Sequence, residues 1–78
     1  MKVELKMPKL RANADTGILC AWLKESGEAF QFGEALCEVE TDKVVHQVAA
    51  EQNGVMGRQF AEEGDEVAVG AVIAEVEA

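Results

Sequence analysis

Glu-Val-Glu-Thr-Asp-Lys-Val-Val, residues 38–45, stands near the middle of the 78-residue chain. Apolar side chains recur at every second position from Ala35 to Val39, and the residues after Lys43 are rich in β-branched valine. Each run has the composition of a β-strand, and only three residues separate them. The stretch therefore predicts two antiparallel strands joined by a tight hairpin, with Lys43 at its tip.

The type of turn at this tip follows from its residues. A two-residue hairpin loop usually contains glycine because both central residues need a positive φ, and Asp42-Lys43 supplies none. We therefore expect a type I turn, which aspartate tolerates, and expect Asp42→Gly to loosen it. The β-branched neighbours Thr41, Val44 and Val45 have stiff side chains, so the hairpin should hold its tip still while the lysine side chain moves.

A repeat with a shift of 37 residues runs through the chain. Seven identities fall in the 24 positions aligned from Gly17 to Glu40. They pair Gly17, Glu25, Gly27, Gly33, Glu38, Val39 and Glu40 with Gly54, Glu62, Gly64, Gly70, Glu75, Val76 and Glu77. Two copies are too few for a solenoid, so we expect two similar halves that close face to face around a common core.

The repeat and the regularly spaced turn glycines together predict an all-β fold. We expect a small flattened β-barrel or sandwich of two four-stranded antiparallel sheets with pseudo-twofold symmetry, a barrel-sandwich hybrid. No window has a helical period with caps. Under the same shift the hairpin at Lys43 corresponds to the chain ends, which predicts that tip and termini lie at opposite ends of the molecule.

Length and cysteine content indicate one small domain, residues 1–78. A domain of this size buries only about 60% of its unfolded surface. Cys20 and Cys37 each lie in an apolar strand pattern, without the dense spacing of a disulfide scaffold, so we expect two reduced core residues. No signal peptide or long apolar run is present, which favours an intracellular soluble protein or a domain of one.

The charge balance argues against two classes of partner. Seven basic residues stand against 15 acidic ones, a net charge of −8. Nucleic acid and anionic membrane surfaces both require clustered lysine and arginine, so we expect neither as a partner. The acidic residues beside the tip, Glu38, Glu40 and Asp42, would instead steer the domain toward basic surfaces of other proteins.

No arrangement of residues indicates catalysis or metal binding. His46 is the only histidine, and its strand parity places it at the inner rim of the fold as a structural residue. There is no second histidine and no Cys-x-x-Cys spacing to form a metal site. Cys37 lacks a basic neighbour that would activate its thiol. We expect no catalytic residues and no metal ligands.

A family resemblance extends this interpretation. Glu40-Thr41-Asp42-Lys43-Val44 resembles the attachment motif of lipoyl domains in 2-oxo acid dehydrogenase complexes. The resemblance covers nearly the whole chain. Similar residues occur in that family at the positions of Met7-Pro8, Gly17, Trp22-Leu23, Gly27-Glu28, Gly33-Glu34, Gly54 and from Gly64-Asp65 to Gly70.

The resemblance implies a carrier without catalytic activity of its own, part of a dihydrolipoamide acyltransferase. Lys43 would hold lipoic acid in amide linkage, and this swinging arm would shuttle acyl groups and reducing equivalents between active sites. It also implies that Glu40, Thr41, Asp42, Val44 and Gly27 contribute to recognition by the attaching enzyme or the dehydrogenase.

The implied partners are a lipoate-attaching ligase or transferase, a 2-oxo acid dehydrogenase, the acyltransferase core and dihydrolipoamide dehydrogenase. The implied location is the cytoplasm of a bacterium or the mitochondrial matrix of a eukaryote. The chain would be the amino-terminal piece of an acyltransferase or a stand-alone carrier. Val44-Val45 looks slightly more like 2-oxoglutarate than pyruvate complexes.

Three alternatives remain open at this point. A biotinyl carrier domain shares the fold, but its lysine usually lies between methionines, where this chain has Asp42 and Val44. A glycine-cleavage H protein is longer and adds helices. An unmodified β-sandwich interaction module would leave Lys43 free. The chain also departs from the family at Arg11, where Gly or Ser is frequent, in its Asp15-Thr16 loop, and at Ile18, which is more often polar.

Overall fold

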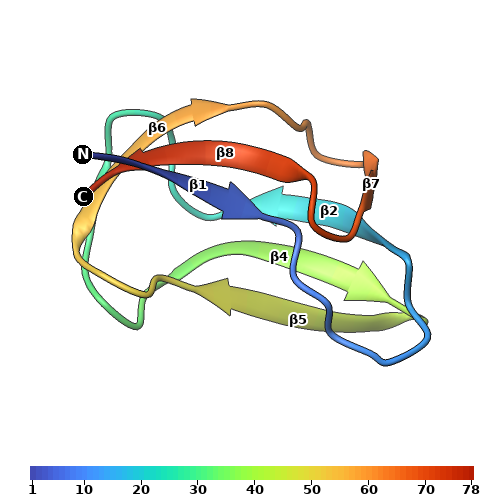
Figure 1. Ribbon diagram of the computed structural model, residues 1–78. Coiled ribbons are helices and arrows are strands. Elements are labelled where there is room, and N and C mark those ends of the chain that lie inside the picture. The colour runs from blue at the N-terminus through green and yellow to red at the C-terminus, as the bar shows by residue number, and fades with distance from the viewer.

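The computed structural model describes all 78 residues and is built entirely of β-strands (Figure 1). The strands are β1 (Lys2–Lys6), β2 (Thr16–Trp22), β3 (Ala29–Phe30), β4 (Ala35–Thr41), β5 (Val44–Ala49), β6 (Gly54–Gln59), β7 (Glu66–Ala68) and β8 (Val72–Glu77). No helix has the length and apolar character needed to cross a membrane. The all-β prediction is confirmed.

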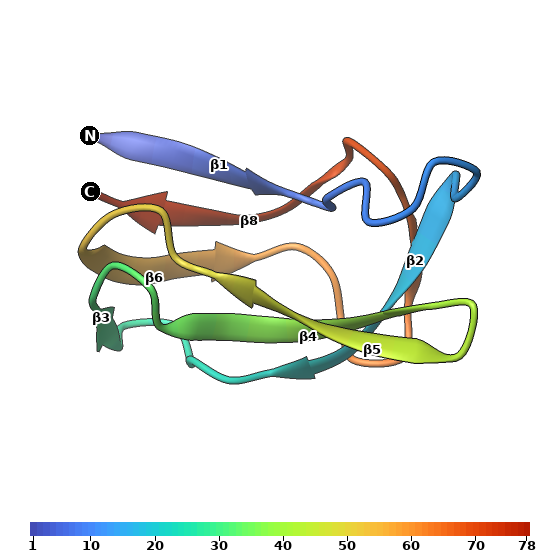
Figure 2. The ribbon, with the colours of Figure 1, turned by 90° about the horizontal axis from the view of Figure 1, so that it is seen from below.

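The strands form two four-stranded antiparallel sheets, ordered β1-β8-β6-β3 and β5-β4-β2-β7 (Figures 1 and 2). A shift of 37 residues carries β2 onto β6, β3 onto β7 and β4 onto β8. β5 then corresponds to β1 across the chain ends, so each sheet order maps onto the other. The pseudo-twofold sandwich expected from the repeat is confirmed.

The repeated glycines sit where the backbone requires them. Gly27, Gly33, Gly64 and Gly70 all have φ between +90° and +97°, a region that side-chain-bearing residues rarely adopt. The hydrogen bonds repeat as well, because Gly27 N–H donates to Met56 O at 2.7 Å and Gly64 N–H donates to Leu19 O at 2.7 Å. Both halves use the same turns to bring their sheets together.

The hydrophobic core likewise consists of two clusters. One buried cluster contains Met7, Leu19, Cys37, Val39, Ala61 and Ile73, and the other contains Phe30, Leu36, Ala50, Met56, Ala74 and Val76. The shift pairs Leu19 with Met56 and Val39 with Val76. Both clusters draw on the central strands β4 and β8, so each of these strands contributes buried side chains along most of its length. The hairpin tip therefore extends from a strand that cannot move independently of the core.

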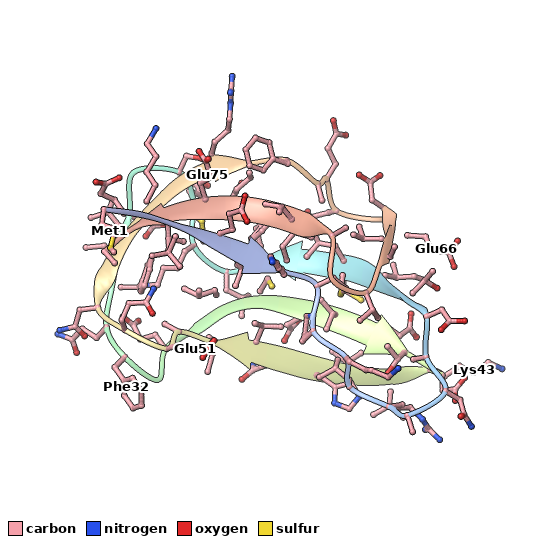
Figure 3. The ribbon with its side chains drawn as sticks, in the orientation of Figure 1. Met1, Phe32, Lys43, Glu51, Glu66 and Glu75 are labelled. Atoms are coloured by element: carbon pink, nitrogen blue, oxygen red, sulfur yellow. The ribbon has the colours of Figure 1, made fainter.

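Tip and termini lie at opposite ends of the longest dimension, which is 32 Å (Figure 3). Pairing of β1 with β8 brings the chain ends together, and the Met1 ammonium lies 3.0 Å from a carboxylate oxygen of Glu77. Lys43 projects at the other end, beyond β4 and β5. This confirms the arrangement expected from the repeat.

The prediction for the cysteines is right for one residue and wrong for the other. Both thiols are free, and Cys37 is fully buried. Cys20 is partly exposed, because the register between β2 and β4 passes from Leu19–Val39 to Ala21–Glu38 and leaves Cys20 as an extra residue. The thiol pKa of Cys20 is raised by burial and by Glu40 and Glu38. The bulge breaks the strand alternation on which the core assignment depended.

Burial of Cys37 gives the fold a pH dependence. Burial raises the pKa of this thiol to about 11, whereas a thiol in an unfolded chain titrates near about 8.5. Between these values the unfolded chain loses the proton first, so the free energy of unfolding should fall as the pH rises. Urea denaturation at a series of pH values measures the free energy of unfolding, which should fall more steeply with pH in the wild type than in Cys37→Ala. Equal pH dependence in the two proteins would contradict the expected protonation of Cys37.

Candidate functional site

The β4–β5 hairpin closes with a loop of two residues. Thr41 pairs with Val44 and Glu40 pairs with Val45, so only Asp42 and Lys43 remain for the turn. Their φ angles are +51° and +63°. Two successive left-handed residues define a type I′ turn.

The expected type I turn is therefore wrong. A type I turn would splay the strands, whereas type I′ matches their right-handed twist. The pairing of Thr41 with Val44 fixes the loop at two residues, and the turn must then follow the twist of the strands. Asp42 tolerates the left-handed region, but Lys43 is held there against its steric preference. Glycine at position 42 could adopt the observed φ of +51°, so the loosening expected of Asp42→Gly stays a prediction.

The Lys43 side chain is exposed and takes part in no hydrogen bond or ion pair. It extends away from the body of the molecule (Figure 3). Val44 and Val45 beside it are also exposed, at 47% and 55%. An enzyme approaching along the long axis therefore meets a primary amine with exposed valines on one side and exposed Asp42 on the other, and no hydrogen bond or ion pair holds the amine.

Thr41 lies beneath the tip and is only 5% exposed. Its methyl group faces Gly17, where an added Cβ would lie 3.5 Å from Thr41 Cγ2 and 3.1 Å from Met7 Sδ. Its hydroxyl oxygen and the Nε2 atom of His46 are buried and have no hydrogen-bond partner. His46 is half-buried in β5, at the inner rim as expected. The buried Thr41 side chain thus fills the space beneath the turn.

The surface around the tip is acidic and partly hollow. A hollow of about 350 Å³ is lined by the carboxylate residues Asp15, Glu40, Asp42 and Glu66, together with Thr41 and five other residues. Asp42 also forms an ion pair, with its Oδ2 atom 3.4 Å from Nε of Arg11. The sequence marked Arg11 only as a departure from the family and not as a site residue, since no local pattern shows where a long loop will pass. Its contact with the tip emerges only in the folded chain.

Of the expected recognition residues, Glu40, Thr41, Asp42 and Val44 are brought together at the hairpin. Gly27 is not. It lies in the connection from β2 to β3, which runs away from the tip, and its N–H is bonded to Met56 in the opposite sheet (Figure 2). Any part that Gly27 has in recognition must involve a second contact surface.

Comparison with known proteins gives the family. Residues 3–78 match the model of the biotin–lipoyl family described as "Biotin-requiring enzyme". The chain is 44% identical over 73 residues to a dihydrolipoyllysine-residue succinyltransferase of the 2-oxoglutarate dehydrogenase complex of Staphylococcus saprophyticus. That alignment covers 94% of this chain and 17% of the relative. The chain belongs to the lipoyl-domain family.

Two further comparisons place this lipoyl domain among its relatives. It is 39% identical over 75 residues to the acetyltransferase component of the Zymomonas mobilis pyruvate dehydrogenase complex, covering 95% of this chain and 17% of the relative. The chain therefore spans about a sixth of the length of the curated relatives that it matches. The solution structure of a lipoyl domain from the Azotobacter vinelandii 2-oxoglutarate dehydrogenase complex superposes with a TM-score of 0.81, at 33% identity, over 97% of this chain and 96% of that one.

A more distant structure shares only the fold. A single-chain, multi-domain long-chain acyl-CoA carboxylase superposes with a TM-score of 0.83 at 18% identity, over 97% of this chain and 7% of the other. The fold is thus common to proteins of different function. A lipoyl domain is a carrier in an acyltransferase component and is not catalytic by itself.

The left-handed backbone of Lys43 predicts that glycine stabilises this turn. Lys43→Gly removes the clash between Cβ and the backbone and should raise the free energy of unfolding by about 1 kcal/mol. Urea denaturation measures the change. Lys43→Ala is the matched control, since it removes the same charge and keeps Cβ, and it should give no stabilisation. Equal stability of the two variants would argue against strain at this position.

The unpartnered hydroxyl of Thr41 predicts an unusually mild substitution. Thr41→Val replaces a buried oxygen with a methyl group of similar size, so stability should be unchanged or rise by about 1 kcal/mol. The control is Thr16→Val, which removes an exposed hydroxyl that donates to Glu66 Oε2 at 3.1 Å. Thermal unfolding compares the two. Clear destabilisation by Thr41→Val would mean that a water molecule satisfies its hydroxyl.

Proposed function

We propose that Lys43 carries lipoic acid in amide linkage, and that the domain shuttles acyl groups and reducing equivalents between the active sites of a 2-oxo acid dehydrogenase complex. The observation that supports this most directly is the isolation of the Lys43 amine at a two-residue tip, at the opposite end from the chain termini. A domain tethered through its termini would present this amine to distant active sites.

The residues around Lys43 suit the attachment reaction. Amide formation requires a primary amine that reaches the activated carboxyl group inside an attaching enzyme, and no ion pair or hydrogen bond has to break first. The hairpin supplies position, because β4 is anchored in both core clusters. Once bound, the lipoyl group would supply a disulfide ring that accepts an acyl group together with electrons.

Recognition would use the surface that the hairpin presents. Val44 is an exposed apolar contact, and the carboxylates of Glu40 and Asp42 add negative charge beside it. Thr41 would act through the shape of the turn, since its side chain is buried. Gly27 would belong to a separate contact, because its turn lies away from the tip.

The partners follow from the complexes that contain the relatives. We infer a lipoate-attaching ligase or transferase, a 2-oxo acid dehydrogenase, an acyltransferase core and dihydrolipoamide dehydrogenase. The 2-oxoglutarate complex is the preferred assignment, since the Staphylococcus relative and the Azotobacter structure both come from such complexes. The compartment would be the bacterial cytoplasm or the mitochondrial matrix.

Biotin is the second candidate for the group on Lys43, because the matching family also includes biotin-requiring enzymes. Asp42 and Val44 stand where a biotinyl domain usually has methionines. The relatives compared in sequence are both acyltransferase components. These observations favour lipoic acid.

Intact-mass analysis tests the proposal. After incubation with ATP, lipoate and lipoate ligase, the wild type should gain the mass of one lipoyl amide, and it should gain none with biotin and biotin ligase. Lys43→Arg should abolish the gain, and Lys9→Arg, a change at another exposed lysine, should not. The lipoylated domain should then be reductively acylated faster by 2-oxoglutarate dehydrogenase than by pyruvate dehydrogenase. Biotinylation, or lipoylation of the Lys43→Arg variant, would contradict the assignment.

A further inference from the structure

The two halves of the molecule differ in one connection. Residues 50–53, four in number, join β5 to β6, whereas the equivalent connection from β1 to β2 has nine, residues 7–15. The turns and core clusters described above repeat closely, so the five extra residues are a local departure from the symmetry. They lie at the same end of the molecule as Lys43 (Figures 1 and 3). The asymmetry is thus confined to the surroundings of the lysine.

One ion pair joins this loop to the tip. The molecule contains three ion pairs, and the pair between Arg11 Nε and Asp42 Oδ2 at 3.4 Å is the only one that involves the loop or the hairpin. Asp42 directly precedes Lys43. Arg11, Ala12, Asn13, Ala14 and Asp42 line a hollow of about 300 Å³. Met7 and Leu10 anchor the loop in the core, whereas its outer part meets the tip through one ion pair beside a hollow.

The contribution of this pair to stability should be small. The Arg11 and Asp42 side chains are 52% and 73% exposed, and an exposed ion pair typically contributes no more than about 1 kcal/mol. The loop has little else to hold its outer part, since residues 11–13 are exposed and the only backbone hydrogen bond within it runs from Ala14 N–H to Arg11 O at 3.1 Å. The main consequence of the pair is the position of the loop.

We propose that Arg11 is a positioning residue that fastens the outer part of the 7–15 loop to Asp42, so that loop and lysine tip meet a partner enzyme as one surface. Ordering a free loop at an interface costs free energy, and a loop already held in place lowers that cost. Arg11 also pairs with the carboxylate next to Lys43, whereas Asp15, Glu40 and Glu66, which line the hollow beside the tip, form no ion pair.

This inference rests on the proposed carrier function for its effect on partners, but its structural part can be tested on the unmodified domain. Arg11→Gln and Asp42→Asn should each speed hydrogen exchange of the Ala14 amide, which donates to Arg11 O, by about three- to fivefold, the factor for a contact of up to about 1 kcal/mol. Lys9→Gln is the matched control, since it removes the same charge from the same loop but breaks no ion pair. Raising the salt concentration should bring the wild type toward the Arg11→Gln rate.

The second readout uses the lipoylated domain as substrate of the 2-oxo acid dehydrogenase. Arg11→Gln should lower kcat/KM for reductive acylation by up to about three- to fivefold through KM, because the loop must then be ordered on binding. Lys9→Gln should not have this effect. Arg11→Gln combined with Asp42→Asn should be no worse than the more impaired single variant. Arg11→Asp combined with Asp42→Arg should recover part of the loss.

Two results would overturn the inference: hydrogen exchange in Arg11→Gln that equals that of Lys9→Gln, or additive losses in the double variant. A wild type that is not lipoylated would refute the proposed function instead. In that case the exchange experiment still decides whether Arg11 positions the loop.

Discussion

The register between β4 and β5 is the constraint on which the site depends. Val39 must face the core, and with it Thr41 turns inward at the last position of the strand. The partner of Thr41 is Val44, so the loop has two residues and both must adopt positive φ. A slip of one residue would turn Val39 outward, so burial of this side chain also fixes the place of Lys43 at the tip.

The pseudo-twofold symmetry turns a small chain into a rigid support. A domain of this size has little core to use, yet here each sheet contributes one long central strand, β4 or β8, to two buried clusters. The same symmetry places the β1–β8 pair with its chain ends opposite the β4–β5 hairpin. The pseudo-twofold symmetry thus accounts both for the rigidity of the sandwich and for the separation of the hairpin tip from the chain ends.

Local rules of chain conformation are broken mainly at the site. Lys43 occupies a region of φ that disfavours side chains, and Thr41 and His46 bury polar atoms without partners. The equivalent positions at the other end are chain termini, where no turn is required. Such departures are tolerated where the surrounding structure imposes them, and they concentrate at functional sites. Here the packed strands of the hairpin impose them.

The sequence by itself determined the strands, the turn glycines, the twofold repeat and the lysine at the tip. These features depend on alternation and spacing within a few residues, or on a repeat that can be counted along the chain. Only the tertiary structure decided the type I′ turn, the bulge that exposes Cys20, the distance of Gly27 from the tip and the pairing of Arg11 with Asp42. Each of these depends on sheet twist, register or the path of a loop, and such quantities become fixed only when the two sheets close on each other.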